Sequence, residues 1–383
     1  MRTYFIVSIS AFLFISVVQA QEKKPDEGYL FNDDIKIEST EVVSQDRTGT
    51  CWSYATTSFL ESEVERINGK PVDLSEMFQV RNIYIEKAKN YVLRQGKTQF
   101  SQGSLSHDVM KSVEQYGVVP QSAYDGLNYG TETHNHSEME KVLSNILDAI
   151  VQNPNGELTP VWLDAYTASL DTYLGSAPTE IDYNGNSYSP KELAEELKIN
   201  TDDYVTFTSF NHHPFYEQFI LEVPDNWSNG SYYNIKLDEF IQLIDHALEN
   251  GYSLAWDADV SEKTWSTKEG VAIIPETDYS SLSRSNREVF FDSVQEEKEI
   301  TQEYRQQEFE NYNTTDDHLM HIVGRSHNQN GDIFYLVKNS WGTDAGIDGY
   351  QYVSIPYMKL KSIAIMVHKD AVPKAISKKF KQW

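Results

Sequence analysis

The stretch that decides the fold lies at residues 45–55 and reads QDRTGTCWSYA. It contains Cys51, the only cysteine of the 383-residue chain. Gly49 favours a turn just before this residue, and apolar residues recur at helical spacing after it, from Trp52 to Ile67. A long buried helix is therefore predicted to begin near Cys51 and to end at Asn68-Gly69.

A single thiol at the start of a helix suits a reactive nucleophile. One cysteine cannot form an intramolecular disulfide. A thiol attacks well only as the thiolate, and a helix N-terminus together with a neighbouring imidazolium lowers the thiol pKa. The fold would therefore have to bring a histidine beside Cys51. A buried, inert cysteine is the alternative interpretation.

Among the ten histidines, His321 fits this role best. It begins a predicted strand at 321–327, which is followed by the turn Asn328-Gln329-Asn330-Gly331 and a second strand at 333–339. Asn-Gly between two strand-like runs is a good hairpin signal. The hairpin would return Asn339 to the neighbourhood of His321, where the Asn339 side-chain carbonyl can accept a hydrogen bond from the imidazole. Trp341 could then cover that bond from water.

The other paired histidines do not predict a metal site. His134 and His136 lie close together in the sequence, as do His212 and His213, but neither pair has a third ligand at metal spacing. We interpret both pairs as parts of solvated loops, and no metal or other cofactor is expected.

The pattern changes from helical to strand-like along the chain. Helical periodicity covers residues 75–94, 105–116 and most of 130–200. Strand-like runs occupy 204–208, 219–223 and 253–258, a helix is predicted at 237–250, and 280–312 reads as a surface excursion. This order predicts an α+β fold with a helical lobe at about 45–200, a β-rich lobe at about 201–370 and a site in the cleft between them.

Three blocks in this order resemble the active-site blocks of papain-like cysteine peptidases. They are Gln45-Asp46-Arg47-Thr48-Gly49-Thr50-Cys51-Trp52, Leu319-Met320-His321-Ile322 and Asn339-Ser340-Trp341-Gly342. Arg-Thr-Gly before Cys-Trp is most similar to the bleomycin hydrolase / aminopeptidase C branch, and the similarity continues through 114–120, 210–221, 251–259 and 316–370. The resemblance implies a papain-like two-lobed fold with a helical insertion, the helical lobe carrying the Cys and the β-rich lobe carrying the His and Asn.

The same resemblance implies roles for individual residues. Cys51 would be the nucleophile that forms a thioester acyl-enzyme on peptide substrates, and His321 would be the base that later protonates the leaving amine. Asn339 would orient His321, with Trp341 shielding the pair. Gln45 would donate its side-chain amide to the oxyanion, beside the Cys51 backbone N–H.

Two regions depart from the family pattern. A Gly-Gly pair often lines the substrate cleft in the family, but the corresponding region here is Gln102-Gly103-Ser104, which makes Gly103 and Ser104 the substrate-binding candidates. The basic tail at 371–383 is short, whereas the branch has a C-terminal arm that helps to fix the substrate's free N-terminus. The resemblance thus implies an aminopeptidase, and the short tail favours an endopeptidase as the alternative.

Two further alternatives stay open. The same constellation could hydrolyse an amide in a non-peptide substrate, or the chain could be a binding module that kept the fold and lost turnover. The joint presence of Gln45, Cys51, His321 and Asn339 argues against that loss. By resemblance the chain would also form a homo-oligomer, which is a hexamer in the family.

Charge and the first residues bound the partners and the compartment. The formal net charge of −26 and the pI near 4.7 argue against nucleic acid or an anionic membrane as the main partner. Residues 1–20 read as a secretory signal peptide ending at Ala20, which leaves a peptidase domain at 21–383 that is periplasmic or secreted. A membrane anchor is the alternative, but the apolar run from Tyr4 to Val18 is shorter than the roughly 20 residues of a span.

Overall fold

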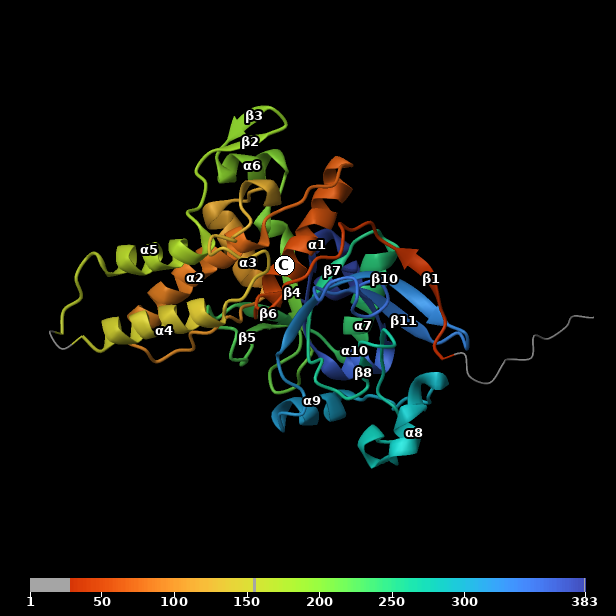
Figure 1. Cartoon of the computed structure of the whole chain (residues 1–383). Helices are drawn as coiled ribbons and strands as arrows, with labels where there is room; N and C mark the ends of the chain where they lie inside the picture. The colour runs from red at the N-terminus through yellow and green to blue at the C-terminus, as the bar shows by residue number, and fades with distance from the viewer. Residues whose placement is uncertain (1–27, 154–155, 382) are drawn as a thin grey trace, which may run out of the picture.

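A large mixed sheet and a set of helices form an α+β fold, as predicted (Figure 1). The structure, a computed structural model, describes residues 28–153, 156–381 and 383. The predicted signal peptide at 1–20 lies outside the described residues. Among those described, no helix combines the length and the apolar character that crossing a bilayer requires.

The helical lobe is built from the N-terminal half of the chain. Its helices are α1 (Cys51–Asn68), α2 (Glu76–Leu93), α3 (Ser106–Tyr116), α4 (Ser137–Val151), α5 (Trp162–Leu174) and α6 (Pro190–Glu196). The predictions for 50–67, 75–94 and 105–116 are thereby confirmed to within a residue or two. Gly69 ends α1 in the left-handed conformation with φ 68°, which explains why the chain places a glycine there.

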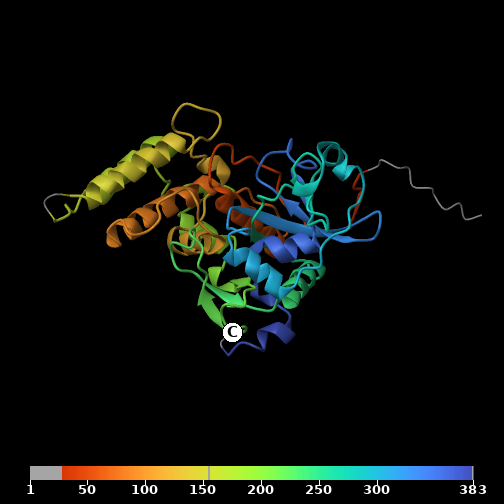
Figure 2. The same cartoon turned by 90° about the horizontal axis from the view of Figure 1, so that it is seen from below.

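The predicted helical stretch at 130–200 forms an insertion that projects from this lobe. Figures 1 and 2 show α4 and α5 running beside α2 and extending away from the sheet. A small hairpin, β2 (Ile181–Tyr183) and β3 (Asn186–Tyr188), precedes α6. The hairpin was not predicted, although its turn at Asn184-Gly185 is the expected signal.

The β-rich lobe is one eleven-stranded sheet with the order β5-β6-β4-β13-β7-β10-β11-β12-β9-β8, and β1 pairs with β10. Its strands are β1 (Phe31–Lys36), β4 (Tyr204–Thr208), β5 (Gln218–Ile220), β6 (Ser231–Asn234), β7 (Leu254–Ala258), β8 (Trp265–Ser266), β9 (Val271–Ala272), β10 (His318–Asn328), β11 (Ile333–Lys338), β12 (Tyr350–Ser354) and β13 (Ser362–His368). The remaining α-helices are α7 (Leu237–Glu249), α8 (Arg284–Glu288), α9 (Gln302–Glu310), α10 (Ile355–Lys361) and α11 (Lys374–Ser377).

Two apolar cores lie on opposite faces of this sheet. Ala255 of β7 packs into the core shared with α1, α2 and α3, whereas its neighbours Leu254 and Trp256 pack into the core formed with α7 and α10. This alternation follows from the two-residue period of a strand. Helix α1 therefore lies between the helical lobe and the sheet, with Cys51 at its first position.

Four local predictions need correction. Strand β10 begins at His318, three residues before the predicted start, and the strand predicted at 219–223 is replaced by the shorter β5. The segment 280–312 is not only a surface excursion, because α9 buries Arg305 completely against the ring of Phe210. His134 and His136 are buried rather than solvated, since they lie where the chain pairs with Arg47.

The C-terminal tail folds back onto the sheet. Helix α11 and the residues after it place Phe380 and Trp383 against the rings of Phe207 and Tyr233, on β4 and β6. Figure 2 shows this end of the chain at the margin of the β-rich lobe. The described part of the tail is therefore a basic segment that is held on one edge of the sheet by a few aromatic and aliphatic side chains.

Candidate active site

Cys51 opens onto a cavity of about 370 Å³ between the two lobes. The helical lobe contributes Gln45, Cys51 and the segment Gly103-Ser104, and the β-rich lobe contributes Asp316 to Leu319. Cys51 itself is only 8% exposed. The predicted residues Gln45, Cys51, Gly103 and Ser104 thus line one cavity.

The imidazole in this cavity belongs to His318. Its Nε2 lies 2.8 Å from Oδ1 of Asn339, and the Trp341 ring stacks on it with centroids 4.6 Å apart. Asn339 Oδ1 also accepts a hydrogen bond from the Ser340 backbone N–H at 2.8 Å, which fixes the orientation of the amide. Because an amide oxygen can only accept, Nε2 of His318 carries the proton and Nδ1 is left free of it.

His321 lies elsewhere, so the predicted pair of His321 with Asn339 is wrong. The His321 side chain lies further along α1, about two turns after Cys51, where its Nδ1 is 2.9 Å from the Ser58 hydroxyl. Its strand partner is Lys338, and it does not line the Cys51 cavity. Trp341 accordingly shields the bond between His318 and Asn339.

A β-bulge explains the difference. At the turn end of the hairpin the register pairs Ser326 with Phe334 and Gly324 with Leu336, and continuing it would place His321 directly opposite Asn339. The register shifts by one residue between Ile322 and Gly324, so His321 pairs with Lys338 instead. A one-residue shift moves side chains to the other face of a strand. Asn339 therefore shares its face with His318, three residues earlier on β10.

Gln45 is held firmly at the mouth of the cavity. Its side-chain carbonyl accepts from the Ser340 hydroxyl at 2.7 Å, and its amide nitrogen donates to the Thr48 carbonyl at 2.7 Å. One N–H of that amide is thereby used and the second remains. The Cys51 N–H has no acceptor within α1 because it is the first residue of the helix.

Gln102 fixes the segment that carries Gly103 and Ser104. Its side chain accepts from the Gly49 N–H at 2.7 Å, and its carbonyl accepts from the Trp52 indole at 2.9 Å. The Ser104 hydroxyl is buried and donates to Asp108 at 2.7 Å. Ser104 therefore offers backbone rather than a free hydroxyl, and Gly103 is the more open of the two candidates.

Burial sets the protonation states of the two central groups. It raises the pKa of the Cys51 thiol to about 12, against a lowering contribution from the Leu319 backbone N–H. It also lowers the pKa of His318 to about 4, although the bond to Asn339 acts in the opposite direction. At neutral pH the free site therefore holds a thiol beside a neutral imidazole.

Three carboxylates near the thiol were missed in the sequence. Asp316, Asp257 and Asp225 each raise the pKa of Cys51, in that order of effect. Asp316 and Asp225 line the cavity itself, while Asp257 pairs with Asp316 from β7. They come from three distant segments, so no local motif marks them.

A second cavity, of about 560 Å³, lies further along α1, where Ala55, Ser58 and Glu61 line it. There the Ser58 hydroxyl lies 2.9 Å from both His321 Nδ1 and the Lys338 ammonium, which also donates to Thr40 at 2.9 Å. Burial, followed by the charge of Lys338, lowers the pKa of His321 well below its ordinary value. His321 is thus a buried, neutral member of a polar network.

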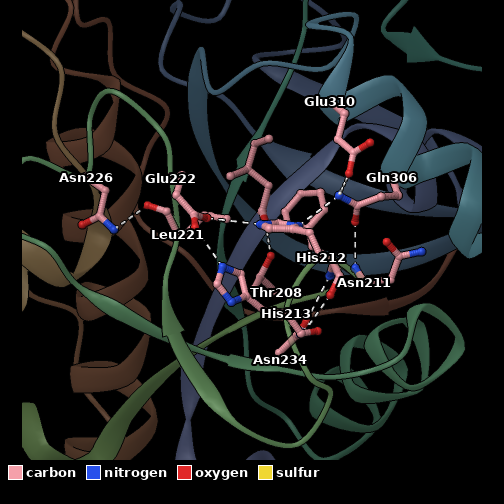
Figure 3. Close-up of polar contacts among 12 residues, drawn as sticks. Thr208, Asn211, His212, His213, Leu221, Glu222, Asn226, Asn234, Gln306 and Glu310 are labelled. Carbon is pink, nitrogen blue, oxygen red and sulfur yellow. Dashed lines mark hydrogen bonds and ion pairs between the residues drawn. The ribbon is translucent and has the colours of Figure 1, made fainter.

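His212 and His213 do acquire a third group, which corrects the prediction for this pair. Glu222 lies with its carboxylate 3.1 Å from His212 Nε2 and 2.8 Å from His213 Nε2, and Figure 3 shows both rings directed at it. The side-chain carbonyl of Gln306 accepts from the Asn211 N–H at 2.7 Å, and its amide donates to His212 Nδ1 at 2.9 Å. His212 Nδ1 must then be an acceptor, so Nε2 carries a proton for Glu222 and has no lone pair for a metal.

The fold and the Cys51 cavity together define a papain-like cysteine peptidase, with a thiol at the start of a central helix and a His–Asn pair on the facing sheet. Residues 180–383 match the model of the Peptidase C1-like family. That match spans more than half of the chain, which therefore belongs to the Peptidase C1-like family and is an enzyme of the cysteine-type peptidase class.

Named relatives agree with this assignment. The chain is 22% identical over 399 residues to Cysteine proteinase 1, mitochondrial, of Saccharomyces cerevisiae, across 92% of this chain and 79% of the relative. It is 24% identical over 396 residues to Aminopeptidase C of Listeria monocytogenes, across 91% and 84% respectively. The crystal structure of pepw from Lactobacillus rhamnosis HN001 shares the fold with a TM-score of 0.71 at 16% identity, across 91% of this chain and 84% of that chain.

Proposed function

We propose that the chain hydrolyses peptide bonds with Cys51 as nucleophile, His318 as general base and Asn339 as the residue that orients the imidazole. The observation that carries this proposal is the shared cavity of Cys51 and His318, with Asn339 bonded to the far nitrogen of the ring. Because Nε2 is engaged, Nδ1 is the nitrogen available to take the thiol proton. The proposal replaces His321 with His318 in the role assigned from the sequence.

Proton transfer accompanies attack in this mechanism. The high thiol pKa and low imidazole pKa keep the proton on sulfur in the free enzyme. As Sγ bonds to the substrate carbonyl carbon, His318 takes the proton and then delivers it to the leaving amine, which breaks the C–N bond and leaves a thioester. Water, deprotonated by the same imidazole, then hydrolyses the thioester.

The remaining N–H of Gln45 and the backbone N–H of Cys51 are the proposed donors to the oxyanion. Gln45 is preorganised for this task because both ends of its amide are already bonded, to Ser340 and to Thr48. Preorganised donors stabilise the tetrahedral intermediate without any reorganisation at the moment of reaction.

The finer proposal is aminopeptidase action. The relatives named Aminopeptidase C support it. Endopeptidase action is the second candidate, because no described residue of the tail at 371–383 lines the Cys51 cavity and Trp383 packs on β4 and β6 instead. We also propose peptides as the only macromolecular substrates and, from residues 1–20, export by a signal peptide, which N-terminal sequencing of the mature protein would test.

Two measurements test the proposed function. A thiol-directed epoxide should label Cys51 in the wild type, and mass spectrometry should place the label there; the His318→Ala variant should label at least tenfold more slowly. Product mapping with peptide pairs that differ only in N-terminal acetylation separates the two specificities. Loss of cleavage on acetylation supports the aminopeptidase, whereas internal cleavage of acetylated peptides supports the endopeptidase. A wild type that neither labels nor cleaves any peptide contradicts the proposal.

A further inference from the structure

The non-catalytic side of the Cys51 cavity is lined by carboxylates. Asp225 reaches it from the loop after β5, and Asp316 and Asp317 reach it from the segment before β10. Neither lysine nor arginine belongs to the described lining of this cavity. Asp316 also lines an adjoining cavity of about 400 Å³, where Glu222 and Glu310 add two more carboxylates.

Asp225 sits directly on the segment that would lie alongside a peptide. A Cβ added to Gly103 would come within 1.9 Å of Asp225 Oδ2, so the carboxylate rests on the glycine backbone and only glycine fits beneath it. Gln99 holds the other oxygen, Oδ1, at 2.7 Å. The carboxylate is thus fixed in the cavity at the end marked by Gly103.

Asp316 and Asp257 lack the donors that buried carboxylates normally require. Asp257 is 4% exposed, and neither of its oxygens accepts a hydrogen bond from any described residue; the same holds for Asp316 Oδ2. The Asp257 and Asp316 side chains lie close enough to share a proton, and burial raises the pKa of both. Buried carboxylate oxygens ordinarily accept hydrogen bonds, and these three oxygens of the buried Asp257 and the partly buried Asp316 accept none from the described residues.

The nearest buried cation does not fill this need. Burial raises the pKa of Asp225, and the charge of the Lys87 ammonium acts to lower it. The ammonium itself donates to the backbone carbonyls of Ser101 and Gly103. Its bonds therefore hold the Gly103 segment in place. On the cavity side, no lysine or arginine of the described lining pairs with Asp225, Asp316 or Asp317.

We propose that Asp225 and Asp316, with Asp257 behind them, bind a cationic group of the substrate and thereby decide which peptides reach Cys51. The cation is either the free α-ammonium of the peptide or a lysine or arginine side chain next to the scissile bond. Asp225 would also limit how far a peptide extends past Gly103, a task that the described part of the C-terminal tail is too distant to perform. This inference rests on the proposed function, since it names the substrate class of the same site.

The test measures kcat/KM for matched peptides with the wild type, Asp225→Asn and Asp316→Asn. One pair differs by N-terminal acetylation, and a second pair replaces lysine by norleucine beside the mapped cleavage position. For the recognised cation, each variant should lose about 10- to 100-fold, because a hydrogen bond to a charged group is worth that much. The loss on the matched neutral peptide should stay within threefold, and the pair that shows the difference identifies the cation.

Asp164→Asn, at an exposed position in α5, is the matched control for removal of one negative charge and should change neither pair. Equal losses on cationic and neutral peptides, or no loss in either variant, would overturn the inference while leaving the peptidase intact. Calorimetric binding of the uncleaved peptides to Cys51→Ala separates the two claims. Charge-selective binding without any turnover in the wild type would sustain the inference and reject the proposed function.

Discussion

Two cavities lie along helix α1, and in each of them a histidine of β10 lies beside a potential nucleophile. At the start of α1 His318 shares a cavity with Cys51, and about two turns further on His321 lies 2.9 Å from the Ser58 hydroxyl. The second cavity is the larger, at about 560 Å³ against about 370 Å³. Judged by residue type alone, each cavity contains a base and a nucleophile.

The two sites differ in what surrounds the pair. Cys51 is the first residue of α1, where backbone N–H groups are free, whereas Ser58 lies two turns further on, where they are bonded within the helix. His318 is oriented by an amide oxygen, whereas His321 has the Lys338 ammonium nearby, which disfavours a positive imidazole. Of the two cavities, only that of Cys51 therefore offers free N–H groups for an oxyanion and an imidazole that can accept a proton. Position on the helix and strand register, more than residue type, separate a reactive site from a structural network.

The nucleophile gives the largest expected effect. Cys51→Ala should lower kcat/KM for peptide cleavage by about 10⁴-fold or more, because Cys51 carries the only thiol of the chain and the Ser104 hydroxyl in the same cavity is bonded to Asp108. Ser58→Ala, the matched change in the second cavity, should leave kcat/KM within threefold. Comparable losses in the two variants would erase the distinction between the cavities.

The oxyanion donor comes next. Gln45→Ala should lower kcat by about 10²- to 10³-fold with little change in KM, since the donor acts mainly on the charge that develops in the transition state. Steady-state kinetics on a good peptide substrate provide the measurement. An increase in KM alone would show instead that Gln45 only binds substrate.

The orienting amide should have a smaller effect. Asn339→Ala removes the acceptor of His318 Nε2–H and should lower kcat/KM by about 10- to 100-fold, the worth of a buried hydrogen bond. Asn339→Gln should recover part of this loss if the acceptor itself matters. Full activity in Asn339→Ala would argue that Trp341 alone positions the imidazole.

Substitutions in the second cavity, which contains Ser58, should change the stability of the protein rather than its activity. Burial, then the charge of Glu61, raises the pKa of Glu76 to about 8, and burial raises that of Glu61 to about 7, with Asp73 and Lys338 also facing them. Both folded-state pKa values lie above the unfolded value, so their stabilisation is complete below about pH 4.5 and is lost as pH rises through 7 to 8. Glu76→Gln should therefore have a free energy of unfolding roughly 1–3 kcal/mol above that of the wild type at pH 9, and a correspondingly higher melting temperature. It should show no such gain at pH 5. Thermal melts at the two pH values provide the measurement, and a gain of equal size at both would contradict the account.

The sequence was sufficient for the helix at Cys51, for the α+β class and for the positions of Gln45 and Asn339. The helix, the class and Asn339 depend on local signals, such as Gly69, which ends α1, and the Asn-Gly turn of the hairpin, whereas Gln45 was assigned only through the family resemblance. The family resemblance added the cysteine peptidase class, which the Peptidase C1-like match supports.

The predicted contact of His321 with Asn339 was wrong because it depends on a single residue of register. An unbulged hairpin would have paired His321 with Asn339, and the shift between Ile322 and Gly324 changes that partner to Lys338. A β-bulge leaves no reliable mark in one sequence. The carboxylates of Asp225, Asp257 and Asp316 were missed for a different reason, since only tertiary packing brings these three segments together.

The central claim is that the bulge assigns the base to His318, and a direct comparison of two variants tests it. We expect His318→Ala to lower kcat/KM by about 10²- to 10⁴-fold, the usual contribution of a general base. We expect His321→Gln, which keeps a polar group in the buried network, to retain kcat/KM within threefold after correction for folded fraction. A collapse of activity in His321→Gln together with near wild-type cleavage by His318→Ala would contradict the account.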